Sequence, residues 1–396
     1  MPDAPVVSSW WRFPLALMLL EVVVYLSQDM YLPALPVVQR WFGVSQASAQ
    51  LSIAAWTSGA ALVQLVTGPV SDRFGRRSVL LAGVLCFVVS SAACAVLSGF
   101  EWFLAARVAQ GCAGIWATSA GYAAIHELFE ARTAIRLQAW MNSITVLGPA
   151  LGPALGAALL LLAPWQGMFV LLAGCAAGLV LPLWKWVPET VDPANGSVLS
   201  ARRIGADYLA LLRNGPMMCL LGCWCLVFTV MVLWAVSGPF MLRERGGFVW
   251  AQMYGCGAFI VGTRLVGRVL DLYPRPTMLC SALDLCVVGM AATLAAALLH
   301  APAWLVVGLY GLFMAGSGLL LAPLYRAVLD RAQQDMGLRV AWVSSVINVA
   351  GSLACALAAL LEVDQMRTFS LLGLLAVLGA RALARSRRGL AAAPAY

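Results

Sequence analysis

Apolar runs of membrane-spanning length recur along the whole chain, and they constrain its fold more than any other feature. A helix needs about 17–25 mainly apolar residues to cross a bilayer, because each backbone polar group must be satisfied within the segment. We therefore expect an all-α polytopic membrane protein with twelve transmembrane helices. The runs are 13–38, 49–70, 78–98, 101–124, 134–161, 167–187, 217–241, 249–270, 276–299, 302–326, 339–361 and 367–384.

The composition excludes a soluble domain and sets the orientation of the chain. Of the 396 residues only 11% are charged, whereas soluble domains carry about 25%. The net charge of +8 could indicate a nucleic-acid partner, but most basic residues fall in connectors on one side of the expected membrane. This asymmetry follows the positive-inside rule. It predicts cytoplasmic termini and no nucleic-acid partner.

The longest polar connector lies between the sixth and seventh runs and divides the chain into halves. We expect an N-terminal six-helix bundle over 1–187, a cytoplasmic linker over 188–215, and a C-terminal bundle over 216–396 that ends in a short basic tail. The halves share a weak repeat, because Gly, Asp and Arg recur at equal spacing after the second and eighth runs. Two pseudo-symmetric bundles around a central cavity are typical of one large class of transporters.

The first run carries two carboxylates, Glu21 and Asp29. A charge near the bilayer centre costs at least about 2.5–3.5 kcal/mol, so such residues usually serve a function. The two acids lie about 12 Å apart along a helix axis and about 80° apart around it, so both can face one cavity. Tyr25 and Gln28 add polar groups to the same sector. We interpret this stripe as a site for protons and substrate.

Arg107 lies within the fourth run, where it needs a counter-charge, carbonyl partners or water. The alternative is that its side chain snorkels outward to the surface.

The fifth run contains a glycine face with two prolines, which permits close helix contact and bending. This face comprises Gly148, Gly152, Pro153 and Gly156.

The connector after the second run combines glycines with one acid and three arginines, which offer exchangeable ion pairs. A simple basic loop that sets topology is the alternative. Its residues are Gly68, Asp72, Arg73, Gly75, Arg76 and Arg77.

In the second half, we expect Asp284 to pair with Arg264 on an adjacent helix, while a second proton site is the alternative.

Together these motifs resemble the major facilitator superfamily. The loop is similar to the signature between its second and third helices, and the glycine face resembles its antiporter motif. The first run, with the segments 121–130, 164–171 and 187–191, most resembles the MdfA-like multidrug:proton antiporters, near the Bcr/CflA drug-resistance transporter group. The second half matches only loosely, chiefly around Trp234.

The resemblance implies a proton-coupled efflux transporter in a bacterial inner membrane, acting on lipophilic cationic and possibly neutral drugs by alternating access. Glu21, Asp29 and Arg107 are then the proton-coupling residues, and Asp72 and Arg76 latch the cytoplasmic side with Glu127. The implied substrate pocket comprises Glu21, Tyr25, Gln28, Asp29, Tyr122, Met141, Asn142 and Trp234. We expect a monomer without cofactor or metal.

Four other classes of function compete with this interpretation. A carrier of one metabolite, such as a sugar, an amine or a siderophore-like product, has the same architecture. A channel needs a continuous polar pore and a sensor needs a signalling domain, and neither is evident. An enzyme is disfavoured because the sequence has no metal set, nucleophile–base pair or phosphate loop.

Overall fold

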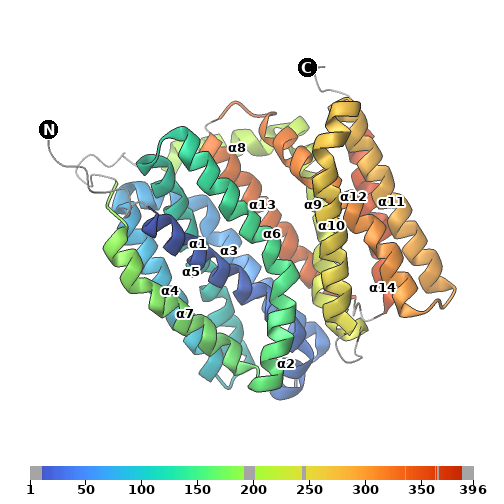
Figure 1. Cartoon of the computed structure of the whole chain (residues 1–396), viewed down its shortest axis with the longest axis horizontal. Coiled ribbons are helices and arrows are strands. Elements are labelled where there is room, and N and C mark those ends of the chain that lie inside the picture. Colours follow the sequence, from blue (N-terminus) through green and yellow to red (C-terminus); the bar gives the residue numbers. More distant parts are fainter. Residues whose placement is uncertain are drawn as a thin grey trace. The chain divides into compact units, whose positions relative to one another are not determined.

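The computed structural model describes residues 11–190, 201–242, 247–334, 336–361, 363 and 365–385; side chains at 131–132, 134–136, 138–140, 142–147 and 201–204 lie outside this description. The chain divides into two compact units, Met1–Ser200 and Ala201–Tyr396. Figure 1 shows the helices of each unit coloured along the chain.

Within the described residues, the first unit contains seven α-helices and one 3-10 turn. They are α1 (Arg12–Asp29), η1 (Leu32–Ala34), α2 (Leu35–Phe42), α3 (Gln46–Phe74), α4 (Arg76–Val96), α5 (Phe100–Leu128), α6 (Ala131–Leu162) and α7 (Gln166–Trp186). Ser45 caps α3, because its hydroxyl accepts the backbone N–H of Ser48 at 3.0 Å. The prolines of the α6 glycine face remain inside an unbroken helix.

The part of the second unit that the structure describes also contains seven α-helices. They are α8 (Ala201–Arg213), α9 (Gly215–Met241), α10 (Gly247–Leu272), α11 (Arg275–Leu298), α12 (Ala303–Leu329), α13 (Met336–Leu360) and α14 (Met366–Arg385). Helix α8 lies in the polar connector that we expected to be a linker. The boundaries drawn for that linker stay a prediction.

Every expected span coincides with a helix, which confirms the all-α fold with twelve spans. Nine helical segments of the described residues are apolar enough by composition to cross a membrane, with α1, η1 and α2 counted as one. The first span is not one straight helix, because α1 ends at Asp29 and η1 follows. Pro33 and Pro36 each lack the N–H that a continuous helix needs. The second carboxylate therefore lies where the regular helix ends.

The helices pair in the same pattern within each unit. In the first, α5 packs on α3 and α4, and α1 packs on α6 and α7; in the second, α12 packs on α10 and α11, and α9 packs on α13 and α14. Glycines seat equivalent pairs closely, because a Cβ there would meet the backbone of the facing helix. These glycines are Gly59 and Gly111 between α3 and α5, and Gly262 and Gly318 between α10 and α12. The two bundles are thus pseudo-symmetric.

Candidate functional site

Glu21 is buried in the middle of α1, with 1% of its surface exposed. The hydroxyl of Tyr122, on α5, donates a hydrogen bond to Glu21 Oε1. The two residues are far apart in sequence, and their side chains meet because α1 and α5 pack against each other. The structure therefore brings together two of the residues expected in the substrate pocket, one of them a carboxylate that can bind a proton.

Asp29 is also buried, with 8% of its surface exposed, and it lies against the glycine face of α6. A Cβ at Gly148 would lie 2.9 Å from Asp29 Oδ2, and a Cβ at Gly152 would lie 2.5 Å from Asp29 Cβ. A Cβ at Gly156 would overlap the backbone of Met30. The absence of side chains on this face is thus what admits the end of α1. The antiporter-like motif and the second acid form one contact.

Arg107 is fully buried in α5, so its side chain does not snorkel outward. The guanidinium donates to three oxygens at 2.5–3.3 Å, namely the carbonyls of Ser27 and Ser52 and the side chain of Gln110. Its central carbon lies over the rings of Tyr31 and Phe169, at 4.9 and 5.6 Å from their centroids. Among the residues that the structure describes, no carboxylate forms an ion pair with Arg107.

A chain of further polar contacts fixes this arginine. Gln110 donates to Ser91 Oγ at 2.8 Å, and the hydroxyls of Tyr31 and Ser52 lie 2.9 Å apart. Sequence reasoning missed Ser27, Ser52 and Ser91, because serine is common in membrane helices and carries no spacing signal. Carbonyl partners, rather than a counter-charge, hold the buried cation in this state.

The other expected pocket residues lie in different surroundings. Tyr25 and Gln28 are half-buried on α1, and Met141 is fully buried in α6. The side chain of Asn142 lies outside the described residues. Trp234, in the second unit, is 2% exposed and donates to Gln252 Oε1 at 2.9 Å. The Trp234 ring stacks on the ring of Tyr310, with 4.5 Å between the ring centroids, and its centroid lies 5.5 Å from that of Phe369. Trp234 therefore belongs to an aromatic cluster inside that unit.

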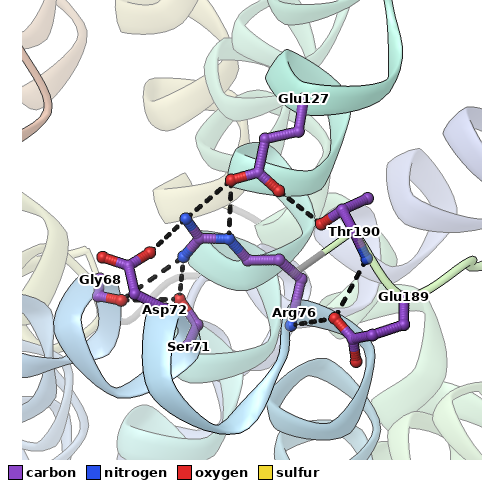
Figure 2. A network of polar contacts seen from close by, with 7 residues as sticks. All are labelled: Gly68, Ser71, Asp72, Arg76, Glu127, Glu189 and Thr190. Carbon is purple, nitrogen blue, oxygen red and sulfur yellow. Dashed lines mark hydrogen bonds and ion pairs between the residues drawn. The ribbon is translucent and has the colours of Figure 1, made fainter. Parts of the chain in front are cut away.

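The signature loop between α3 and α4 is organised around Arg76, whose side chain is 11% exposed. Its guanidinium forms ion pairs with Asp72 and, at 2.9 Å, with Glu127 at the end of α5. Figure 2 shows the whole set, which we call the Arg76 network. Its members are Gly68, Ser71, Asp72, Arg76, Glu127, Glu189 and Thr190.

The loop's other arginines point elsewhere. Arg77 donates to the carbonyl of Trp184 on α7 at 2.6 Å, and Arg73 lies over the ring of Phe74. The backbone carbonyl of Gly68 accepts a hydrogen bond from Arg76 Nη1 at 3.4 Å. Gly75 lies between α3 and α4 and has a φ of +90°. The expected contact between Arg76 and Glu127 is therefore present, and Arg77 anchors the loop to α7.

Glu127 lies beyond the predicted span 101–124, near the C-terminal end of α5. Burial raises the pKa of Glu127, but hydrogen bonds from Arg76 and Thr190 and the charge of Arg76 outweigh it and hold the pKa below its ordinary value of 4.5. A carboxyl with a lowered pKa stabilises the folded state above its ordinary pKa, and this contribution is lost as the pH falls through the lowered value. The Glu127 carboxylate therefore stays ionised across the neutral range.

The second unit contains a partial counterpart of this network. Arg275, at the start of α11, pairs with Asp330 just after α12 at 3.8 Å, and Arg326 pairs with the same carboxylate at 3.0 Å. Asp330 thus occupies the place in the repeat that Glu127 has in the first unit. Asp271, which the sequence repeat aligned with Asp72, takes part in no ion pair within the described residues.

Our expectation for Asp284 is wrong, because its partner is Arg381 of α14 and not Arg264. Nε of Arg381 lies 2.7 Å from Asp284 Oδ1, and its Nη2 donates to Oδ2 at 2.7 Å. Helix α11 packs on α14 but only slightly on α10, its neighbour in sequence. Proximity along the chain therefore misled the assignment. This ion pair with one hydrogen bond supports a structural role for this acid.

Replacing Asp284 with Asn removes the charge of this pair and should leave the proton coupling expected from the family resemblance unchanged. Because 54% of the Asp284 side chain is exposed, we expect a loss of less than about 1 kcal/mol in stability. Thermal unfolding and drug-driven proton release, measured on the same preparation, check both expectations. Abolished proton release with normal expression would show that Asp284 is a proton site.

The site can now be compared with known proteins. A sequence profile described as Major Facilitator Superfamily matches residues 17–361. The chain is 32% identical over 332 residues to the multidrug transporter MdfA of Yersinia pestis bv. Antiqua (strain Angola), covering 81% of this chain and 80% of that protein. It is 32% identical over 325 residues to the multidrug resistance protein MdtM of Salmonella typhimurium (strain LT2), covering 80% of this chain and 78% of that protein.

A solved structure supports the architecture independently. The fold is similar to the crystal structure of a D-xylose-proton symporter, with a TM-score of 0.73 and 16% sequence identity. The likeness covers 94% of this chain and 97% of that protein. At this identity the comparison establishes the fold alone.

Proposed function

This chain belongs to the major facilitator superfamily, and we propose that it is a multidrug efflux transporter that exchanges protons for lipophilic drugs. Membership makes it a multi-pass membrane transporter rather than an enzyme. The names of its relatives, the multidrug transporter MdfA and the multidrug resistance protein MdtM, support drug-like substrates. The observation that carries the proposal is the burial of two carboxylates, Glu21 and Asp29, on one helix.

Competition between proton and drug provides the coupling. A lipophilic cation that approaches Glu21 favours the ionised carboxylate, whereas a proton neutralises the same group. Tyr122 already donates to Glu21, so a polar group is in place that favours the ionised form. Because each ligand lowers the affinity for the other, drug entry releases protons. Two acids allow cationic and neutral drugs to be exchanged for different numbers of protons.

The neighbouring residues take distinct parts in this proposal. Asp29 lies where α1 ends and against the glycine face of α6, so a shift of either helix changes its surroundings. Arg107 is held by carbonyl groups of α1 and α3 and provides a fixed positive charge in the same bundle. Within the first unit, Tyr25 and Gln28 are half-buried on the same helix as the two acids and are the proposed polar contacts of the substrate.

The remaining parts of the proposal concern the whole cycle. The protein works as a monomer in a bacterial inner membrane with both termini in the cytoplasm, and no cofactor takes part. The two units alternate between states open to either side. The Arg76 network then serves as the cytoplasmic latch of the cycle.

Proton release on drug addition tests the proposal most directly. Purified protein in weakly buffered detergent should release protons when ethidium, a cation, or chloramphenicol, a neutral compound, is added. As the pH decreases, drug affinity should fall by up to about tenfold per pH unit for each proton displaced, because the linkage is reciprocal. A pH-sensitive dye and equilibrium binding measure the two quantities.

The outcome separates the proposal from its competitor. Saturable proton release with several unrelated drugs supports multidrug exchange. A response to one metabolite alone would indicate a specific carrier instead. Drug binding that neither releases protons nor depends on pH would overturn the proposed coupling.

A further inference from the structure

Two side chains that follow α7 enter the Arg76 network, and the sequence marked them only through the family resemblance of segment 187–191. Glu189 Oε1 accepts the backbone N–H of Arg76 at 2.8 Å and the backbone N–H of Thr190 at 3.1 Å. The hydroxyl of Thr190 donates to Glu127 Oε2. Figure 2 shows both residues on the segment that leaves α7, facing the loop between α3 and α4. Three separate stretches of chain therefore meet at Arg76.

Glu189 closes the beginning of α4. The first N–H groups of a helix have no partner within it, and a carboxylate there also meets the positive end of the helix dipole. Gly75, the residue before α4, has a φ of +90°, which favours glycine. A Cβ at Gly75 would also lie 2.7 Å from the carboxyl carbon of Glu189. Gly75 is thus required both for the turn and because a side chain there would overlap the Glu189 carboxylate.

Thr190 fixes the orientation of Glu127. Arg76 donates to Glu127 Oε1 from Nε at 3.2 Å and from Nη2 at 2.9 Å, while Thr190 holds the other oxygen. The Glu127 side chain is 36% exposed, and a partly exposed ion pair contributes little unless its geometry is fixed. The hydroxyl provides that geometry, because it prevents the carboxylate from rotating away from the guanidinium.

We propose that Glu189 and Thr190 are positioning residues for transport, which hold Arg76 and Glu127 together in the latched state. The proposal rests on the proposed function, since a latch must form and release in each transport cycle. The chain continues from Thr190 to the second unit, which begins at Ala201. The latch therefore includes the start of the covalent connection between the units.

Hydrogen exchange of the full-length protein in lipid nanodiscs tests the contact without requiring transport. Thr190→Val should raise the exchange rate of the first amides of α4 by about threefold to tenfold, the value expected for one lost hydrogen bond. Thr190→Ser should retain the wild-type rate. Thr293→Val is the matched control, because the Thr293 hydroxyl donates to Gly289 O of its own helix at 2.7 Å.

A double-variant cycle shows whether Thr190 acts through Glu127. If it does, adding Thr190→Val to Glu127→Gln raises the exchange rate no further than Glu127→Gln alone. Unchanged exchange in Thr190→Val, or additive effects in the double variant, would overturn the contact as a working part of the latch.

Drug transport in proteoliposomes then tests the role in the cycle. Thr190→Val should lower the maximal rate of ethidium exchange by about threefold to tenfold and leave the half-saturating drug concentration unchanged, with Thr190→Ser restoring the rate. A merely structural defect would lower the amount of folded protein and not the rate per folded molecule. A wild-type rate in Thr190→Val would refute the positioning role, whereas absent exchange in the wild type would refute the proposed function instead.

Discussion

Replacing Glu21 with Gln and Asp29 with Asn together should abolish drug-driven proton release while the protein still folds and inserts. Both amides match the shape of the acids and retain an oxygen that can accept a hydrogen bond, such as the one Tyr122 donates at position 21. Neither amide can bind and release a proton near neutral pH. The number of protons released per drug should therefore fall to the background of the dye measurement.

Three variants complete this experiment. Each single substitution should leave part of the release, because the other acid remains. Asp284→Asn is the matched control, since that acid is held by Arg381 and lies in the second unit. Size-exclusion profiles confirm folding of every variant. Full proton release by the folded double variant would mean that other groups carry the protons, and the mechanism proposed for α1 would be wrong.

Replacing Gly152 with Ala should destabilise the first unit and disrupt exchange, although alanine normally favours a helix. A Cβ at this position would lie 2.5 Å from Asp29 Cβ and 3.0 Å from Asp29 C, so α1 and α6 must separate. Overpacking of this kind costs about 1–3 kcal/mol. The separation also removes the close contact that fixes Asp29, so exchange should fall together with thermal stability.

Gly174→Ala is the matched control for this substitution. Gly174 lies in α7, and no atom of a neighbouring helix comes within 4 Å of the position that an alanine methyl group would take there. Alanine should therefore be neutral at this site or stabilise the helix by up to about 1 kcal/mol. The two glycine-to-alanine changes should thus have opposite signs in thermal unfolding. Wild-type stability and exchange in Gly152→Ala would show that the close contact between α1 and α6 is dispensable.

The spans and the buried acids were predictable because the bilayer imposes a simple rule. Each crossing needs an apolar run of fixed length, so twelve helices could be read directly, and Glu21 and Asp29 stood out against that background. The Arg76–Glu127 contact was expected from the family resemblance and is present. The role of Glu21 and Asp29 in coupling stays a prediction, which the Glu21→Gln/Asp29→Asn and Gly152→Ala variants test.

Partners of buried polar groups were harder to predict. Asp284 was assigned to Arg264 because α10 and α11 are consecutive, yet α11 packs mainly on α12 and α14. For Arg107 a counter-charge, carbonyl partners and water were all left open, and the structure shows that it donates to the carbonyls of Ser27 and Ser52. Every residue has a backbone carbonyl, so no residue type marks such a partner in the sequence.

The sequence by itself determined the class of the molecule, the number of spans and the residues whose charge is costly in a membrane. These properties depend on local composition, since each span must satisfy its own backbone hydrogen bonds. Only the tertiary structure decided that Tyr122 meets Glu21, that the α6 glycines seat Asp29, and that Glu189 and Thr190 complete the Arg76 network. Such contacts join residues far apart in the chain, and helix packing alone sets which of them meet.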